Sequence, residues 1–161
     1  SEKDCSLNQR FKVMLIEFEK LSALQGNVAM VDGAFDPLHR GHIEYFRAAS
    51  SLGLPLLCNL ASDHYILTKH PPFLSEDQRA VIVDAIKFIS YTHINRFDTA
   101  TILRELQPRY YVKGQDWKGK LPAEQVATCT EHHIEVVYLD TVIDSSSRIL
   151  KEFIEQQRNY T

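Results

Sequence analysis

The amino-acid sequence predicts an α/β fold: a doubly wound parallel sheet of five strands with helices on both faces, preceded by a helix at the N-terminus. Short apolar segments, each about the length of a buried strand, alternate along the chain with amphipathic segments long enough for helices. Strands that alternate with helices connect by right-handed crossovers, which produce a parallel sheet. The 161 residues suit one compact domain.

The first expected element is an amphipathic helix over residues 7–24, within an N-terminal segment (1–26) that precedes the main domain (27–161). Its apolar residues recur at helical spacing on one face: Leu7, Phe11, Met14, Leu15, Phe18, Leu21 and Leu24. Gly26 is a plausible end to the helix. We expect this helix to dock on its own domain, and the alternative is a contact between the two chains of a homodimer.

The first half of the main domain reads strand, helix, strand, helix. Strands are predicted at residues 28–31 and 54–60, and helices at residues 43–49 and 75–86. Ser75 is a good N-cap, and Glu76 and Asp77 suit the positive end of the helix dipole. Residues 64–74 are expected to form a mobile loop.

The second half continues the alternation. Strands are predicted at residues 89–94, 110–112 and 134–139, and helices at residues 99–106, 122–132 and 146–157. Tyr91 and Thr92 favour a strand, because aromatic and β-branched side chains suit a pleated surface. Pro108 ends the preceding helix, since proline lacks the backbone N–H that a helix needs.

Composition narrows the class of protein. The hydrophobic fraction of 44% is normal for a globular domain, and no apolar run approaches the roughly 20 residues of a membrane helix. With a net charge of −3 and a pI near 6.1, no basic surface is implied, so neither nucleic acid nor a membrane is an expected partner. The N-terminus shows no secretory signal, and the three cysteines have no metal-like spacing, which indicates free thiols in a reducing cytoplasm.

Polar and glycine residues gather in the loops that follow the predicted strands. These loops are residues 33–36 with His39 and His42, residues 62–64, residues 113–117 and residues 144–148. In a doubly wound sheet the ligand binds beyond the carboxyl ends of the strands, where the strand order reverses. The functional site is therefore expected at this edge.

The stretch His39-Arg40-Gly41-His42 predicts a phosphate site at the start of a helix. Gly41 lets the backbone approach a ligand closely. The first turn of a helix offers unpaired N–H groups and a positive dipole end. The two imidazoles add donors that can stabilise charge developing on a phosphorus centre.

The same stretch, preceded by Phe35 and Asp36, resembles the HxGH signature of the nucleotidyltransferase superfamily and its cytidylyltransferase-like family. Residues 114–120 resemble a GDDWEGK motif of glycerol-3-phosphate cytidylyltransferases, and residues 106–114 an LRPDVLVKG motif of heptose 1-phosphate adenylyltransferases. Residues 145–149 resemble the STS or STT segment that opens the last helix in both. This resemblance implies a Rossmann-like fold.

The resemblance implies attack by a substrate phosphate on the α-phosphorus of CTP or ATP, with release of pyrophosphate. His39, His42, Lys69 and Arg79 would take the catalytic roles, with Arg79 binding or lining the pocket of the substrate phosphate. The nucleotide would be bound by Gly33, Ala34, Phe35, Gly41, Lys113, Gly114, Asp116, Trp117, Ser145, Ser146 and Ser147. A Mg²⁺ ion would bridge the phosphate oxygens. The expected acceptor is a sugar or polyol phosphate, and the expected assembly is a homodimer.

Several residues depart from the family pattern or have plainer interpretations. Ala34 and Gln115 replace a polar and an acidic residue, and residues 140–144 lack the arginine of an R-T-E-G stretch. Two alternatives therefore stay open: a catalytically silent nucleotide-binding or regulatory subunit, and an adenylyltransferase of the pantetheine-phosphate or nicotinamide-mononucleotide type. Asp36 is interpreted as a structural hydrogen-bond acceptor, and Trp117 as either a packing or a base-stacking residue.

Overall fold

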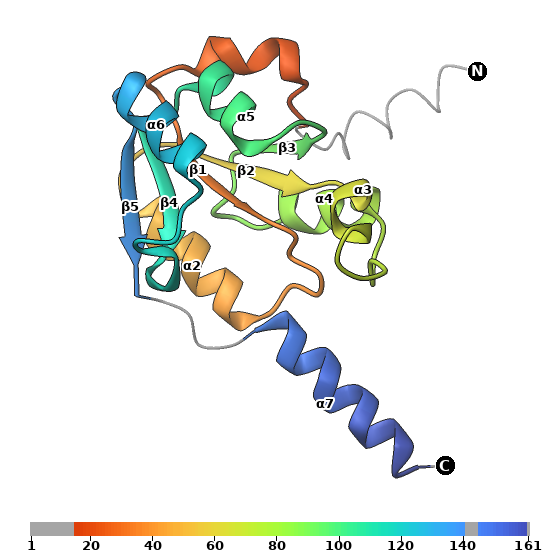
Figure 1. The fold of residues 1–161 in the computed structure, drawn as a ribbon. Coiled ribbons are helices and arrows are strands. Elements are labelled where there is room, and N and C mark those ends of the chain that lie inside the picture. The colour runs from red at the N-terminus through yellow and green to blue at the C-terminus, as the bar shows by residue number, and fades with distance from the viewer. Residues whose placement is uncertain (1–14, 141–144, 161) are drawn as a thin grey trace, which may run out of the picture.

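A five-stranded parallel sheet forms the centre of the molecule in the computed structural model, which describes residues 15–140 and 145–160 (Figure 1). The strand order is β3-β2-β1-β4-β5, and every neighbouring pair is parallel. The strands are β1 (Ala29–Gly33), β2 (Leu56–Ala61), β3 (Tyr91–Asn95), β4 (Tyr110–Gly114) and β5 (Glu135–Leu139). The predicted doubly wound sheet is confirmed, and its order reverses between β1 and β4.

Helices cover both faces of the sheet. The longer ones are α2 (Arg40–Ser50), α4 (Glu76–Asp84), α5 (Thr99–Leu106), α6 (Ala123–Glu131) and α7 (Ser146–Arg158), with shorter turns at η1 (Phe18–Leu24), α3 (Asp63–Leu67) and η2 (Gln115–Trp117). Helices α2 and α4 contact one face, while η1, α5 and α6 pack together over the other (Figure 1). Across the described ranges, no helix combines the length and the apolar character needed to cross a membrane.

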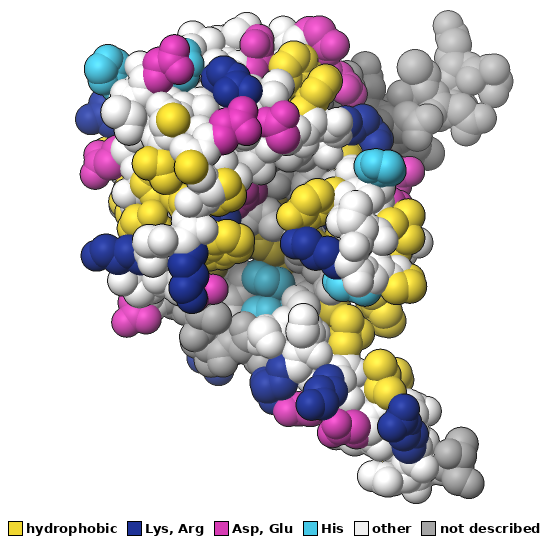
Figure 2. Space-filling model, viewed as in Figure 1, with side chains coloured by type: hydrophobic (Ala, Val, Ile, Leu, Met, Phe, Trp, Pro, Cys, Tyr) yellow, Lys and Arg dark blue, Asp and Glu magenta, His cyan; other side chains and the backbone are white. Residues whose placement is uncertain are grey.

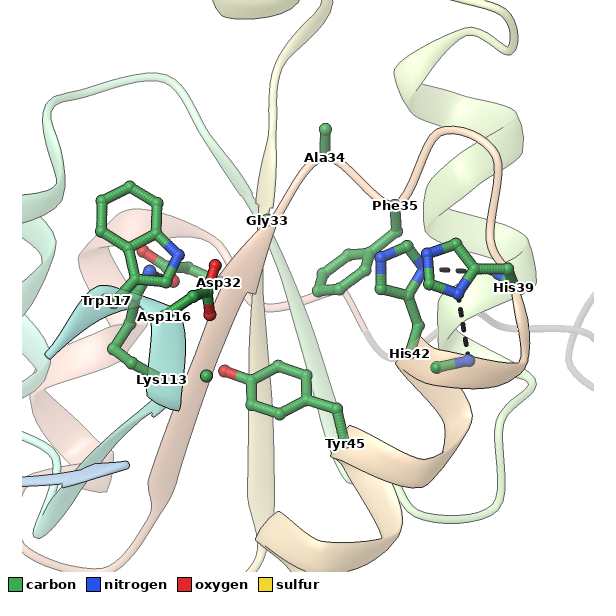
Figure 3. A pocket seen from close by; sticks show the side chains of 12 residues that line it. Asp32, Gly33, Ala34, Phe35, His39, His42, Tyr45, Lys113, Asp116 and Trp117 are labelled. Atoms are coloured by element: carbon green, nitrogen blue, oxygen red, sulfur yellow. Dashed lines mark hydrogen bonds and ion pairs between the residues drawn. The ribbon is translucent and has the colours of Figure 1, made fainter. Parts of the chain in front are cut away.

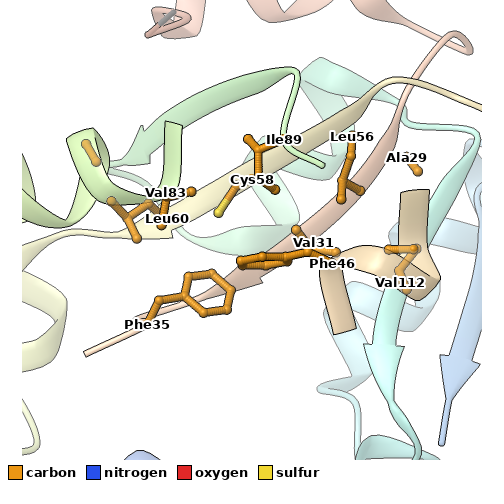
Figure 4. Close-up of a cluster of buried hydrophobic side chains, with 12 residues drawn as sticks. Ala29, Val31, Phe35, Phe46, Leu56, Cys58, Leu60, Val83, Ile89 and Val112 are labelled. Carbon is orange, nitrogen blue, oxygen red and sulfur yellow. The ribbon is translucent and has the colours of Figure 1, made fainter. Parts of the chain in front are cut away.

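The core consists of two apolar clusters, one on each face of the sheet. Val31, Phe46 and Leu60 belong to the cluster beneath α2 and α4 (Figure 4). Met30 and Leu57 point to the opposite cluster beneath α5. Because successive residues of a strand face opposite sides, a central strand buried on both faces is mostly apolar on both, as β2 is except at the buried Asn59. This explains why the first two strands were recognisable as continuous apolar runs.

The N-terminal helix predicted over residues 7–24 differs in its described part, and residues 1–14 lie outside the described residues. Ile16 is extended: its N–H donates to the carbonyl of Thr92 at 2.9 Å, and its own carbonyl lies 2.7 Å from Nδ1 of His93. Only residues 18–24 turn, as the 3-10 helix η1. Pairing with the edge of β3 overrides the helical spacing, but Leu21 is fully buried, so this segment docks on its own domain as expected.

The stretch expected as a loop at residues 64–74 contains a short helix and a fixed end. Helix α3 begins after Ser62, whose hydroxyl accepts from the N–H of Tyr65. At the other end, the carboxylate of Asp36 accepts from the N–H groups of Phe73 at 2.6 Å and Leu74 at 2.9 Å. Asp36 is 4% exposed, so its interpretation as a structural acceptor is confirmed.

Candidate functional site

His39 and His42 lie in the first turn of α2 and hold each other in place. The Nδ1 atom of His39 accepts from the N–H of Gly41 at 3.0 Å, and Nδ1 of His42 accepts from the N–H of His39 at 3.3 Å. The two rings stack with centroids 3.7 Å apart (Figure 3). Because both Nδ1 atoms are acceptors, each neutral ring carries its proton on Nε2. Each imidazole therefore offers one N–H donor to a ligand.

The environment of His42 favours the neutral form of its ring. Burial, and next the electrostatic effect of the neighbouring His39, lower its pKa from 6.5 to about 3. Two stacked imidazoles cannot both carry a proton at low cost, because like charges at this distance repel. At neutral pH His42 acts as a hydrogen-bond donor and not as a cation.

A cavity of about 170 Å³ opens at the carboxyl ends of β1 and β4, where the strand order reverses. We name it the first cavity, and its lining is drawn in Figure 3. It is lined by Asp32, Gly33, Ala34, Phe35, His39, Gly41, His42, Tyr45, Lys113, Gly114, Asp116 and Trp117. Ten of these twelve are residues that the sequence predicted for catalysis or nucleotide binding, so the fold brings together loops that are 80 residues apart in the chain.

The turn after β1 is built on a close approach between Gly33 and Phe35. A Cβ atom on Gly33 would lie 2.9 Å from Cζ of the Phe35 ring, which no side chain allows without a shift. Phe35 itself has a positive φ of 50° and meets the His42 ring edge-on, with centroids 4.8 Å apart. Gly33 thus leaves room for the ring that supports His42.

One wall of the first cavity is a charged and aromatic group that the sequence revealed only in part. The ammonium of Lys113 lies 2.7 Å from Oδ1 of Asp32 and 4.3 Å from the ring centroid of Trp117. Tyr45 closes this side, because its hydroxyl donates to the carbonyl of Val112. Burial, and next the charge of Asp32, raise the pKa of Tyr45. Asp32 could have been suspected from its place at the end of a strand, directly before Gly33.

A second cavity shares Ala34, Phe35 and His42 with the first, so His42 lies between the two. It is lined by Ala34, Phe35, Asp36, His42, Tyr65, Ile66, Lys69, His70, Ser146, Ser147 and Leu150. Figure 2 shows histidine side chains in a hollow that basic and hydrophobic side chains border. Lys69 also lines this cavity, with its ammonium donating to the hydroxyl of Tyr65 at 3.0 Å.

The start of α7 closes the second cavity. The hydroxyl of Ser146 donates to the carbonyl of Pro37 at 2.8 Å, which ties the helix to the loop that carries His39. Ser147 also lines the cavity, whereas Ser145 does not and instead caps α7 by accepting from the N–H of Arg148 at 3.1 Å. Beyond its first turns α7 extends away from the sheet (Figure 1).

Arg79 does not occupy the position that the sequence predicted for it. Its side chain is 1% exposed and lines neither cavity. The guanidinium donates to four acceptors of the protein: the carbonyls of Leu74, Ala34 and Ala61, and Oδ1 of Asp63 at 2.8 Å. A buried guanidinium with these partners has no face left for a substrate phosphate. Arg79 joins the turn after β1 to the end of β2 and to α3, and therefore positions both cavities.

Metal-ligating side chains do not cluster at the site. Within residues 15–140 and 145–160, no three His, Cys, Asp or Glu side chains come together as they would around a metal ion. Both oxygens of Asp36 accept from the backbone, and those of Asp32 accept from Lys113 and Tyr111. The described side chains therefore do not fit a resident Mg²⁺ site. The other carboxylate that lines the first cavity is that of Asp116.

Acid should destabilise the fold through the half-buried His42 and the buried His93. Burial lowers the folded-state pKa of His42 to about 3 and also lowers that of His93, so below pH 6.5 the unfolded chain binds more protons than the folded one. The stabilisation is complete above pH 6.5 and is lost as the pH falls, by at most about 1.4 kcal/mol per pH unit for each histidine. Urea unfolding at pH 7.5, 6 and 5 measures it. His42→Asn should flatten the slope, and equal stability at all three pH values would contradict the expectation.

Comparisons with known proteins agree with this geometry. A family model described as cytidylyltransferase-like matches residues 30–159, which include both cavities and α7. The bifunctional protein HldE of Campylobacter concisus is 34% identical over 110 residues, which are 65% of this chain and 23% of that protein. This chain therefore spans about a quarter of the length of HldE.

Two further relatives extend over most of their own length. The FAD synthase of Archaeoglobus fulgidus is 29% identical over 134 residues, which are 79% of this chain and 97% of the synthase. The crystal structure of a lipopolysaccharide core biosynthesis protein from Thermoplasma volcanium shares the fold, with a TM-score of 0.61 and 23% identity over 71% of this chain and 96% of that one. Because the family model covers well over half of the sequence, the chain belongs to the cytidylyltransferase-like family of nucleotidyltransferases.

Proposed function

We propose that this protein transfers a nucleoside monophosphate from a nucleoside triphosphate, CTP or ATP, to a small phosphorylated acceptor and releases pyrophosphate. The observation that carries the proposal is the stacked pair of His39 and His42. His42 stands between two cavities and both neutral rings offer an Nε2–H donor. Two such donors can stabilise the negative charge on the oxygens of an α-phosphate while the acceptor attacks it and pyrophosphate leaves.

In the proposed reaction an oxygen of the acceptor phosphate attacks the α-phosphorus, and the bond from that phosphorus to the β-phosphate oxygen breaks. The attacking phosphate is already ionised at neutral pH, so no side chain has to remove a proton. Catalysis then depends on positioning and on stabilising the charge of the transition state. His39 and His42 donate to the reacting phosphate, while Lys69 and Ser147 bind the phosphates in the second cavity.

The first cavity is proposed to hold the nucleotide. The backbone from Gly33 to Phe35 would support the α-phosphate, and the loop with Asp116 and Trp117 would contact the sugar and the base. Trp117 is 42% exposed, so its ring retains a face on which a base can stack. This exposure favours base stacking over core packing as the role of Trp117.

We propose that Mg²⁺ accompanies the nucleotide as part of the substrate. Mg²⁺ commonly keeps several waters and is bound by phosphate oxygens together with one or two carboxylates, which does not require a complete set of protein ligands. Asp116 in the first cavity can supply one such carboxylate. The ion would lower the negative charge that the triphosphate brings to a site with few cations.

The acceptor proposed from the sequence is a sugar or polyol phosphate. The relatives leave room for other acceptors, since one is named as the bifunctional protein HldE and another as an FAD synthase. A matrix of CTP and ATP against sugar phosphates, polyol phosphates, flavin mononucleotide, phosphopantetheine and nicotinamide mononucleotide, read by pyrophosphate release, should reveal one productive pair. Nucleotide binding without pyrophosphate release from any pair would instead favour the silent binding subunit.

Two expectations from the sequence remain predictions. The homodimer can be measured by light scattering coupled to gel filtration. A cytoplasmic location is compatible with Cys58 and Cys129, which are both buried free thiols. A monomer at micromolar concentration would contradict the first of these predictions.

A further inference from the structure

A chain of polar contacts runs from α6, along one face of the sheet, to the wall of the first cavity. The hydroxyl of Tyr111 lies 3.1 Å from Oε1 of Gln125 and donates to Oδ2 of Asp32 at 2.8 Å. The other carboxylate oxygen of Asp32 accepts from Lys113 at 2.7 Å. The ammonium of Lys113 in turn lies 4.3 Å from the ring centroid of Trp117. Tyr111 and Lys113 are two positions apart on β4, so their side chains lie on the same face of the sheet, the one that α5 and α6 cover.

The ion pair in the middle of this series of contacts is largely buried, so losing either partner would leave a buried charge unpaired. The side chains of Lys113 and Asp32 are 9% and 14% exposed, so their charges depend on each other. A buried charge without its partner is costly, because water cannot replace the lost contact. With one oxygen on Lys113 and the other on Tyr111, the Asp32 carboxylate has its rotation about the Cβ–Cγ bond fixed by two donors on the same strand.

Tyr111 is built into the core in every respect except its hydroxyl. Its side chain is fully buried and its ring belongs to the apolar cluster beneath α5. A phenylalanine would fill the same space, so the hydroxyl is not needed for packing. Its contribution is the hydrogen bond to Asp32, and desolvation together with that carboxylate raises the pKa of Tyr111, which keeps the hydroxyl protonated as a donor.

We propose that Tyr111 and Asp32 are positioning residues that fix Lys113 and, through it, the indole of Trp117 that receives the nucleotide. This inference rests on the proposed function for the identity of the ligand, but the mechanical link stands on the contacts of the free protein. Tyr111 lines neither cavity, and the contacts that begin at its hydroxyl end at Trp117. A change at Tyr111 should therefore weaken binding of the nucleotide and leave binding of the acceptor unchanged.

The protein contains a single tryptophan, so its fluorescence reports on Trp117 alone. In Tyr111→Phe without ligand, the emission of Trp117 should shift and acrylamide should quench it more strongly, because the ammonium over the ring is no longer held. The Kd for the nucleotide, titrated with the Mg²⁺ complexes of CTP and ATP, should rise about five- to tenfold. In turnover, the KM for the nucleotide should rise while kcat and the KM for the acceptor stay within about twofold.

Tyr110→Phe is the matched control. Tyr110 is the preceding residue of β4 and faces the opposite cluster, and its hydroxyl contacts exposed Arg109 at 3.2 Å. This variant removes the same atom from the same strand and should retain the emission, the Kd and the activity of the wild-type protein. Asp32→Asn removes the charge that holds Lys113 and should exceed the effect of Tyr111→Phe.

The proposal is overturned if Tyr111→Phe is folded and keeps the emission, the quenching and the Kd of the wild type. Should Tyr111→Phe fail to fold, Lys113→Gln tests the same link from its other end. That variant must then reproduce the emission shift and the weaker nucleotide binding, and wild-type values for it would also overturn the proposal. Failure of the proposed function can be distinguished from failure of this proposal. If the wild-type protein binds neither CTP nor ATP, the proposed function is wrong, and the emission of Trp117 in the ligand-free variants still tests whether Tyr111 positions it.

Discussion

Replacing His39 or His42 by asparagine should reduce nucleotidyl transfer by a factor of roughly 10² to 10³ while the fold is retained. Each variant removes one Nε2–H donor from the reacting phosphate, and removing a single donor of this kind costs about 3–4 kcal/mol of transition-state stabilisation. Asparagine is chosen because its side-chain oxygen can still accept from the N–H of Gly41 at the N-cap, which His39 does with Nδ1. Alanine at this position would lose the cap as well as the donor.

The measurement is the rate of pyrophosphate release with the productive pair of substrates, together with thermal unfolding. His133→Asn is the control, because His133 lines neither cavity and has a positive φ of 56° that asparagine tolerates. It should retain full activity. If the double variant His39→Asn/His42→Asn still turns over at the wild-type rate, the two imidazoles do not act on the phosphate and the proposed mechanism is wrong.

Arg79→Met should destabilise the protein by roughly 3–5 kcal/mol, because it leaves three carbonyl groups and the carboxylate of Asp63 without their donor. A loss of this size lowers the Tm by on the order of 10 °C in a domain of this length. Activity should fall as well, since the same guanidinium joins the turn after β1 to α3, which carries Tyr65 into the second cavity. Thermal and urea unfolding measure the first effect.

Arg47→Met is the control for Arg79. Arg47 pairs with Glu44 at 3.5 Å on the surface of α2 with 59% of its side chain exposed, and such pairs contribute about 1 kcal/mol or less. An Arg79→Met protein that keeps its stability but shows a raised KM for the acceptor would contradict the structural role. That outcome would restore the substrate-phosphate role that the family resemblance implied.

Local patterns were sufficient to predict most of the fold. The helix at residues 99–106 has the predicted bounds, and the cap at Ser75 lies where its side chain and the acidic first turn indicated. The predictions failed where a distant partner decides the structure. Residues 15–17 carry helical spacing yet run along the edge of β3, because hydrogen bonds to the backbone of Thr92 and to the His93 ring hold them there.

The candidate site shows the same division. The placement of His39, Gly41 and His42 at the start of α2 was predictable, because the strand-to-helix turn that holds them is formed by adjacent residues. Tyr111 was predicted only as a strand residue, and nothing near it in the chain indicates that its hydroxyl meets Asp32. The family resemblance predicted that Arg79 binds the substrate phosphate, but its burial depends on three segments that fold around it.

The sequence by itself determined the order of strands and helices and the loops that carry the chemistry, since periodicity, caps and turn residues act between close neighbours along the chain. Only the tertiary structure decided what the charged side chains do there. Lys113 pairs with Asp32 from 81 positions away, and the guanidinium of Arg79 lies inside the protein and not in a cavity. Partner choice and burial of a charge depend on which strands and helices become neighbours, and that is a property of the packed sheet.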